Sequence, residues 1–202
     1  IADKIVVDPA RGSGHAWGAA MRGASSHLRT RVSDKGMDYK GYNIAVHEFG
    51  HNVEQTISLY DVDYYAMSGV PNTAVTEALA FVFQKRDLDL LGIKANDPEN
   101  EKMEVLDAAW SLAEIMGVGM TEMLTWLWLY ENPEATPAQL KEKTIEFATQ
   151  TWNKYFAPIT GVKDSPVLAI YSHMIEVPLY LPNYSYGHIV QFQIEKYLKD
   201  KK

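Results

Sequence analysis

The residues best suited to chemistry lie in one short run, Val-His-Glu-Phe-Gly-His, at positions 46–51. His47 and His51 stand four residues apart. In an α-helix this spacing leaves an offset of only about 40° around the axis, so both imidazoles project from one face and can bind a single Zn²⁺. Glu48 lies about 100° around the helix from His47, where its carboxylate can hold and deprotonate a water molecule without ligating the metal. The run predicts a zinc site, with a plain polar stripe on a helix as the alternative.

A catalytic zinc site needs a third protein ligand and an open position. Position 57, where an extended motif would place a third histidine, is Ile57. Glu54 is too close on the same helix to wrap around the ion, and Asp61 and Asp63 lie in a loop that would have to fold back tightly. Glu77 follows a Gly-Val-Pro-Asn turn that would let the next helix return antiparallel to the first, so it is the favoured third ligand. The alternative is that Glu77 is simply a residue that suits the first turn of a helix.

The elements that must position these residues are mostly helical. Short strands are expected at 5–7 and 27–32, separated by the glycine-rich stretch 11–18. On the motif helix, apolar residues at helical spacing form the expected buried face: Val46, Phe49, Val53 and Ile57. Helices are expected over 39–59, 73–90, 101–116, 120–130, 137–155, 167–175 and 183–199. The fold class is therefore mainly α, with a small β element before the motif helix.

Composition narrows the chemistry further. The chain has 202 residues, the length of one ordinary domain, and contains no cysteine, so a bound metal must be held by histidine and carboxylate. Its net charge of −7 lacks the basic footprint of a nucleic-acid-binding protein. The most apolar region, 111–130, is interrupted by Glu114 and Glu122, so no membrane segment is expected. The aromatic run 126–130 within it is expected to lie in the core.

The passage 42–84 resembles the thimet oligopeptidase and oligoendopeptidase F family of zinc peptidases. It combines the His-Glu-Phe-Gly-His motif with Ser68-Gly69 and with Thr-Glu-Ala at 76–78. Members of that family carry the same motif, a Ser-Gly loop, and a ligating glutamate at a separation close to the 26 residues found here. The resemblance implies a zincin-like helical metallopeptidase domain with a Glu as third ligand. It implies that His47, His51 and Glu77 are the zinc ligands and that Glu48 is the general base.

A second matching segment lies near the C-terminal end. In the family, a histidine followed by several tyrosines faces the zinc and stabilises the tetrahedral intermediate. Here His173 precedes Tyr180, Tyr184 and Tyr186. The resemblance implies His173 and Tyr186 as catalytic donors, and Tyr180 and Tyr184 as substrate-binding residues. Imidazole and phenol donors lower the barrier when negative charge grows on a carbonyl oxygen. The alternative is that all four are packing residues.

The N-terminal part carries a weaker match. Family members have a glycine-containing segment and a strand before the motif helix, and the strand can lie beside bound peptide. The stretches 12–18 and 27–32 look similar, although an ordinary hairpin packed on the helices explains them as well. The remaining histidines are expected to be structural or exposed rather than ligands: His15, His27 and His188.

Together these features predict a zinc-dependent metallopeptidase, with one Zn²⁺ and an oligopeptide substrate, in a catalytic domain spanning residues 1–202. Two alternatives stay open: an aminopeptidase with the same ligands, and a zinc- or peptide-binding module that has lost catalysis. Because family members are much longer and the chain starts at Ile1, it is expected to be the C-terminal catalytic part of a longer protein with a further helical domain upstream. No nucleic-acid partner is expected. A soluble location is expected, either cytoplasmic or bacterial exported.

Overall fold

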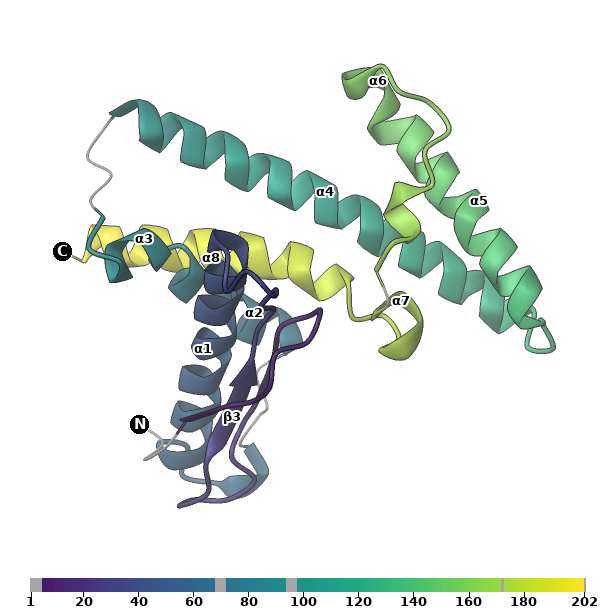
Figure 1. The fold of residues 1–202 in the computed structure, drawn as a ribbon. Coiled ribbons are helices and arrows are strands. Elements are labelled where there is room, and N and C mark those ends of the chain that lie inside the picture. Colours follow the sequence, from purple (N-terminus) through teal and green to yellow (C-terminus); the bar gives the residue numbers. More distant parts are fainter. Residues whose placement is uncertain (1–4, 68–71, 94–97, 172, 202) are drawn as a thin grey trace. The chain divides into compact units, whose positions relative to one another are not determined.

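The structure is a computed structural model that describes residues 5–67, 72–93, 98–171 and 173–201. The chain divides into two compact units. The first comprises Ile1–Asp97 with Gly187–Lys202, and the second comprises Pro98–Tyr186. Most described residues are helical and a small sheet precedes the motif helix (Figure 1), which confirms the mainly α fold class.

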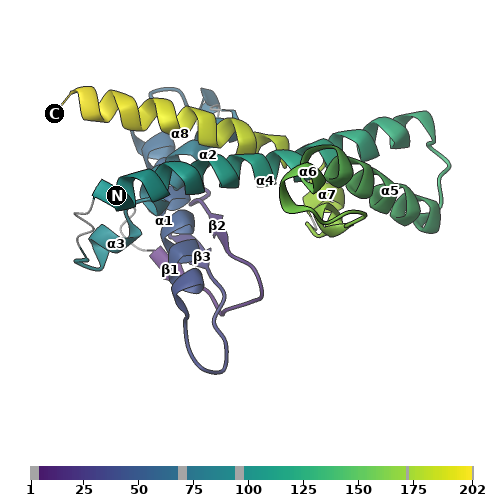
Figure 2. The same cartoon turned by 90° about the horizontal axis from the view of Figure 1, so that it is seen from above.

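The first unit begins with a three-stranded sheet that lies against the motif helix (Figure 2). Strand β1 (Ile5–Val7) pairs in parallel with the central strand β3 (Ser26–Arg29), and β2 (His15–Trp17) pairs antiparallel with the other side of β3. No strand is expected at β2, which lies in the glycine-rich stretch 11–18 between the two expected strands. Its residues pair across the sheet with Arg29, Leu28 and His27, and these long-range pairs outweigh the local turn composition.

Two capped helices follow the sheet. The motif helix α1 (Tyr39–Tyr60) starts at Asp38, whose side chain accepts the backbone N–H of Gly41 at 2.7 Å. After the 3₁₀ turn Tyr65–Met67, helix α2 (Thr73–Gln84) starts at Asn72, whose side chain accepts the backbone N–H of Ala74 at 2.9 Å. Both helices therefore have well-defined starting points, which sets the positions of the site residues along them.

The backbones of α1 and α2 meet at Gly50. A Cβ atom at this position would lie 2.8 Å from the Cα atom of Ala80 and 3.0 Å from the Cβ atom of Phe83. Only a glycine permits this approach without a shift of one helix. His47 and His51 flank the contact on α1, and Glu77 lies one turn before Ala80 on α2. The close crossing therefore brings the three predicted ligands toward one another.

Most buried side chains of α1 are polar, which contradicts the expected apolar stripe. Of the four apolar residues expected there only Val46 is buried, and Ile57 is 52% exposed. The buried polar residues are Glu48, Asn52, Glu54, Thr56 and Ser58. Hydrogen bonds compensate their burial: Asn52 donates to the carbonyl oxygen of His27 in β3 at 3.1 Å, and Ser58 donates to Glu54 at 2.7 Å. Helix α1 contacts the sheet on one side and α2 on another, so its buried residues do not form the single apolar stripe that hydrophobic periodicity predicts.

The expected helix over 73–90 is two helices. Helix α2 ends at Gln84, and α3 (Asp87–Leu90) begins anew with the Asp87 carboxylate accepting the backbone N–H of Leu88 at 2.6 Å. Helix α8 (Pro182–Asp200) belongs to the first unit from Gly187 onward. In the first unit, Arg86 lies between α2 and α3 and forms an ion pair with Glu195 of α8, with a nitrogen–oxygen distance of 2.6 Å. A Cβ atom at Gly187 would lie 3.0 Å from the Cβ atom of Glu77, so α8 lies directly against α2 beside the site.

The second unit is helical. Its elements are α4 (Pro98–Glu131), α5 (Pro137–Tyr155), α6 (Ala157–Thr160), the 3₁₀ turn Val167–Ala169, α7 (His173–Glu176) and the first turn of α8. The expected helix over 167–175 is thus a 3₁₀ turn and a separate short helix. The core of this unit is formed by Val118, Ala148, Phe156, Leu168, Met174 and Leu181.

Helix α4 is continuous where two helices are expected, over 101–116 and 120–130. Gly117 and Gly119, which lie between the two expected helices, are inside α4. A Cβ atom at Gly117 would lie 2.6 Å from the Phe156 ring, so this glycine serves close packing and not chain reversal. The aromatic run 126–130 is not fully in the core, since Leu127 and Tyr130 are exposed. Within the described part of the chain, no helix combines the length and the apolar character needed to cross a bilayer.

Candidate metal centre

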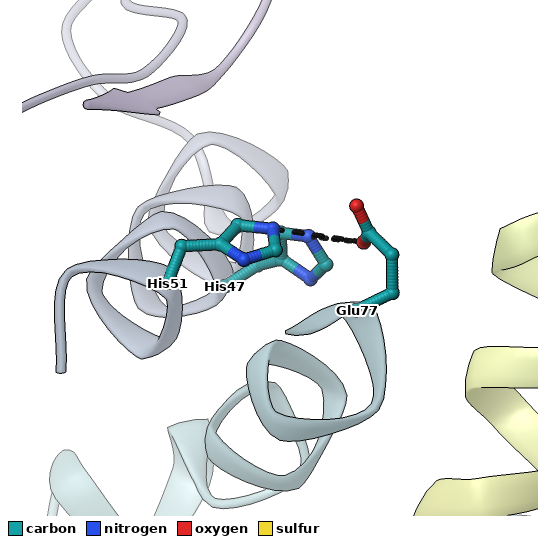
Figure 3. Close-up of side chains that lie close together, drawn as sticks. All are labelled: His47, His51 and Glu77. Atoms are coloured by element: carbon teal, nitrogen blue, oxygen red, sulfur yellow. Dashed lines mark ion pairs between the residues drawn. The ribbon is translucent and has the colours of Figure 1, made fainter. Parts of the chain in front are cut away.

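Three potential metal ligands meet where α1 and α2 cross. Figure 3 shows the rings of His47 and His51 on α1 directed toward the carboxylate of Glu77 on α2. The Nε2 atoms of His47 and His51 lie 3.4 Å and 3.6 Å from Oε2 of Glu77. A donor atom from each of the three residues lies within 4.8 Å of the other two. The cluster can therefore hold a metal ion, as the sequence predicts.

Two of the three donor separations are close to those around a tetrahedral zinc ion. Around a tetrahedral Zn²⁺ with bonds of about 2.0–2.1 Å, neighbouring ligand atoms are about 3.3–3.4 Å apart. The two separations between histidine nitrogen and Glu77 oxygen, 3.4 Å and 3.6 Å, are at or just above this value. Two imidazoles and one carboxylate also form a donor set that leaves a fourth position for water or substrate.

Glu77 has the protonation state that a ligand needs. Its side chain is 1% exposed. Burial alone raises the pKa of a carboxyl group, but the two neighbouring histidines, His47 and His51, outweigh that effect and lower the pKa of Glu77 to about 2. Glu77 is therefore a carboxylate at neutral pH and can bind a cation without first losing a proton.

Glu48 follows His47 on α1 and is also buried, but its protonation behaviour differs. Burial disfavours its charged form, Glu77 adds a like charge, and together they raise the pKa of Glu48 to about 7 although His47 and Arg29 act in the opposite direction. A carboxyl group with a pKa near neutrality can accept a proton and return it under the same conditions. This behaviour is the one that a general base beside a metal requires.

The edge of the sheet runs close to Glu48. A Cβ atom at Gly14 would lie 2.7 Å from Oε1 of Glu48 and 2.3 Å from Cγ2 of Ile44, so only glycine fits here. Gly14 directly precedes β2, the edge strand of the sheet beside β3. An edge strand offers backbone N–H and C=O groups to which an extended peptide can pair. The glycine-containing stretch 12–18 therefore contains the strand β2, which the sequence pattern does not indicate.

His188, which is expected to be structural or exposed rather than a ligand, packs near the cluster and is not part of the ligand group found among the described residues. His188 of α8 stacks on Phe81 of α2, with ring centroids 4.0 Å apart and an interplanar angle of 8°. Phe81 in turn lies 5.1 Å from the His47 ring, measured between centroids. Burial lowers the pKa of His188, and the charges of His47 and Glu77 also act on it. The signal in the sequence is Gly187, whose close contact with α2 brings its neighbour to the site.

The other two histidines agree with expectation. His15 is exposed on β2, where its ring contacts Trp17 edge-on at 4.6 Å between centroids. His27 of β3 is half-buried and hydrogen-bonded to Asp8 at 3.1 Å. Neither belongs to the metal-ligand group found among the described residues.

The four C-terminal candidates lie in the second unit. The ring centroids of His173 and Tyr180 are 5.7 Å apart, and those of Tyr180 and Tyr184 are 5.4 Å apart. The structure therefore brings these three rings together, while Tyr186 is exposed. Their approach to the metal centre, which belongs to the first unit, stays a prediction.

The alternative third ligands do not join the cluster found among the described residues. Asp61 and Asp63 are exposed just beyond α1. Glu54 is buried and accepts the hydroxyl of Ser58 at 2.7 Å. Ser68-Gly69 lies outside the described residues.

No protein-family model, curated protein or solved structure matches this chain.

Proposed function

We propose that the chain is a zinc-dependent metallopeptidase that hydrolyses peptide bonds in oligopeptides, on a zincin-like helical domain. The observation that carries the proposal is the convergence of His47, His51 and Glu77, together with the buried carboxyl of Glu48, on whose pKa the charges of His47 and Glu77 act. The three donors suit a metal with an open position. The carboxyl group of Glu48 suits proton transfer at neutral pH, since its pKa is raised to about 7.

The roles of the residues follow from their chemistry. A zinc ion at this site supplies a Lewis acid that polarises a peptide carbonyl and lowers the pKa of water. His47, His51 and Glu77 hold the ion, and Glu48 accepts the proton of the attacking water at its carboxylate. Glu48 then delivers this proton to the leaving amine, so one residue acts first as base and then as acid.

His173 and Tyr186 are proposed to donate hydrogen bonds to the carbonyl oxygen as negative charge develops there. Tyr180 and Tyr184 are proposed to contact the bound peptide. Support comes from the clustering of His173, Tyr180 and Tyr184 in the second unit. Substituting His173 with Ala is expected to lower kcat while the zinc content is unchanged.

The first test measures metal content and turnover in the full chain. Elemental analysis is expected to find one zinc per chain, and a mixed library of fluorogenic oligopeptides is expected to be cleaved in a chelator-sensitive manner. Cleavage of peptides with a blocked N-terminus separates an endopeptidase from an aminopeptidase, which cannot cut them. Zinc binding without cleavage of any peptide would instead identify a binding module.

The second test removes the proposed base. Glu48→Gln is expected to bind zinc normally and to lower kcat by about 10²–10⁴-fold, because the amide cannot accept a proton. The matched control is Glu54→Gln, a second buried glutamate of the same helix, which is expected to retain activity. Unchanged turnover in Glu48→Gln would show that the proposed mechanism is wrong.

A further inference from the structure

The two ring nitrogens of His47 face different partners. Its Nε2 atom lies 3.4 Å from Oε2 of Glu77, on the side where the ligands converge. Its Nδ1 atom lies 3.0 Å from Oε1 of Gln84, at the end of α2. The sequence spacing explains this arrangement, because Gln84 is seven residues after Glu77 and so lies on nearly the same face of α2.

The contact with Gln84 is the first of a series. Nε2 of Gln84 donates to Oδ1 of Asn43 at 2.5 Å, and Nδ2 of Asn43 donates to Oδ2 of Asp87 at 2.7 Å. Asn43 is four residues before His47 on α1, so these two side chains share a helix face. Side chains from α1, α2 and α3 thereby form one continuous row of hydrogen bonds that ends at Asp87.

Asp87 determines the direction of every bond in the row. Its carboxylate is buried and also accepts the Tyr39 hydroxyl at 2.6 Å and the Leu88 backbone N–H at 2.6 Å. An ionised carboxylate has no proton to donate, so Asn43 must turn its NH₂ group toward Asp87 and its oxygen toward Gln84.

The same logic passes along the row to the histidine. Gln84 must donate its NH₂ group to the oxygen of Asn43, which leaves the Gln84 oxygen facing His47. An amide oxygen only accepts, so the 3.0 Å contact is a hydrogen bond only when Nδ1 of His47 carries a proton. In the neutral ring, Nε2 is then the nitrogen with the lone pair, and it faces the position that Glu77 and His51 surround.

We infer that Gln84, Asn43 and Asp87 are positioning residues that hold His47 in the Nδ1–H tautomer and aim its Nε2 lone pair at the metal position. The inference rests on the proposed metal centre for its purpose, but not for its geometry. A fixed tautomer and ring orientation removes the need to rotate or reprotonate the imidazole before a cation binds.

The direct test is the tautomer of His47 in the full chain, measured without added metal. Long-range ¹H–¹⁵N correlation spectra at a pH where imidazole is neutral distinguish the two forms, and His47→Gln identifies the signals of His47. The expected result is a dominant Nδ1–H form. A dominant Nε2–H form in the unsubstituted chain overturns the inference, whether or not zinc binds.

Variants of Gln84 test the function of the row. Gln84→Met keeps the side-chain volume but removes the acceptor, so the Nε2–H form is expected to appear and zinc affinity to fall about 10–100-fold in chelator competition. Gln84→Glu keeps an acceptor for Nδ1 of His47 but removes the NH₂ group that donates to Asn43, so it is expected to keep the Nδ1–H tautomer while breaking the row beyond position 84. Gln55→Met makes the same change on α1, outside the row of hydrogen bonds. It is the matched control and is expected to change neither the tautomer of His47 nor the zinc affinity.

Asp87→Asn tests whether the row acts as a unit. The amide can donate as well as accept, so the direction is no longer imposed and part of the His47 population is expected to become Nε2–H. An unchanged tautomer ratio in both Gln84→Met and Asp87→Asn overturns the inference. Absence of zinc binding in the unsubstituted chain, with the Nδ1–H form present, would refute the proposed function and leave the positioning geometry intact.

Discussion

At the scale of single residues, the two carboxyl groups of the site differ in what their surroundings do to them. Both are buried, which by itself raises the pKa of a carboxyl group. Two histidines lower the pKa of Glu77 to about 2, whereas the pKa of Glu48 rises to about 7. Neighbouring acids with separated pKa values divide naturally into a permanent anion and a proton carrier. The ligand role of Glu77 and the base role of Glu48 stay predictions, and this division supports them.

Glu77→Gln tests the anion. The amide oxygen is a neutral and weaker donor to a cation, so zinc affinity is expected to fall by more than the roughly 100-fold that loss of an outer-shell partner costs. Chelator competition with a zinc-sensitive dye measures this directly. Glu54→Gln serves again as the buried control on the neighbouring helix. Unaltered affinity in Glu77→Gln would remove this residue from the ligand set.

At the scale of elements, the sequence predicts what local rules govern. Helices α1, α2, α5 and α8 were foreseeable because polar caps, prolines and helical spacing mark them. Strand β2 was not, because it forms through long-range pairing with β3. The unbroken α4 was not, because the reason for Gly117 is the Phe156 ring, which is distant in sequence. The three-ligand cluster was foreseeable since its residues are close in sequence. The packing of His188 near it was not, because His188 is more than 100 residues away in the chain.

Gly50→Ala tests the crossing of α1 and α2. The new methyl group would lie 2.8 Å from the Cα atom of Ala80, so the helices must move apart. Overpacking of this kind costs about 1–3 kcal/mol, and alanine's better helix propensity returns about 1 kcal/mol of it. The expected result is a lower free energy of unfolding in urea together with weaker zinc binding. Gly12→Ala, where no atom lies within 4 Å of the added Cβ, is the control and is expected to change neither.

At the scale of the whole molecule, each unit contains a buried carboxyl group that folding must accommodate. In the second unit it is Glu122 of α4, whose Oε2 atom accepts the backbone N–H of Leu181 at 2.9 Å. Burial raises the pKa of Glu122 although the backbone N–H groups of Leu181, Tyr180 and Leu179 act to lower it. Leu179 has a φ of 59°, a left-handed conformation that this interaction helps to hold. Glu122 thereby anchors the segment that carries Tyr180.

A raised pKa makes the stability of the molecule depend on pH. The folded chain binds the Glu122 proton more tightly than the unfolded chain, so this group's contribution is greatest below the ordinary carboxyl pKa and declines as pH rises through the raised value. Glu122→Gln removes that decline while its amide oxygen can still accept from Leu181. Urea unfolding between about pH 4 and pH 7 is therefore expected to shift in favour of the variant as pH rises. Glu131→Gln, at the exposed end of α4, is expected to show no such trend.

The buried polar side chains of α1 have a consequence for how the first unit assembles. Apolar faces gain from any loose collapse, but buried carboxyl, amide and hydroxyl groups gain only once their particular partners are in place, and are penalised before then. Helix α1 therefore has little to hold it in a half-formed state against β3 or α2. Its docking is expected to be all-or-none, so native-state hydrogen exchange should show the amides of α1, α2 and β3 opening together with a single free energy. Sequential opening, with α1 exchanging well before α2, would contradict this cooperative assembly.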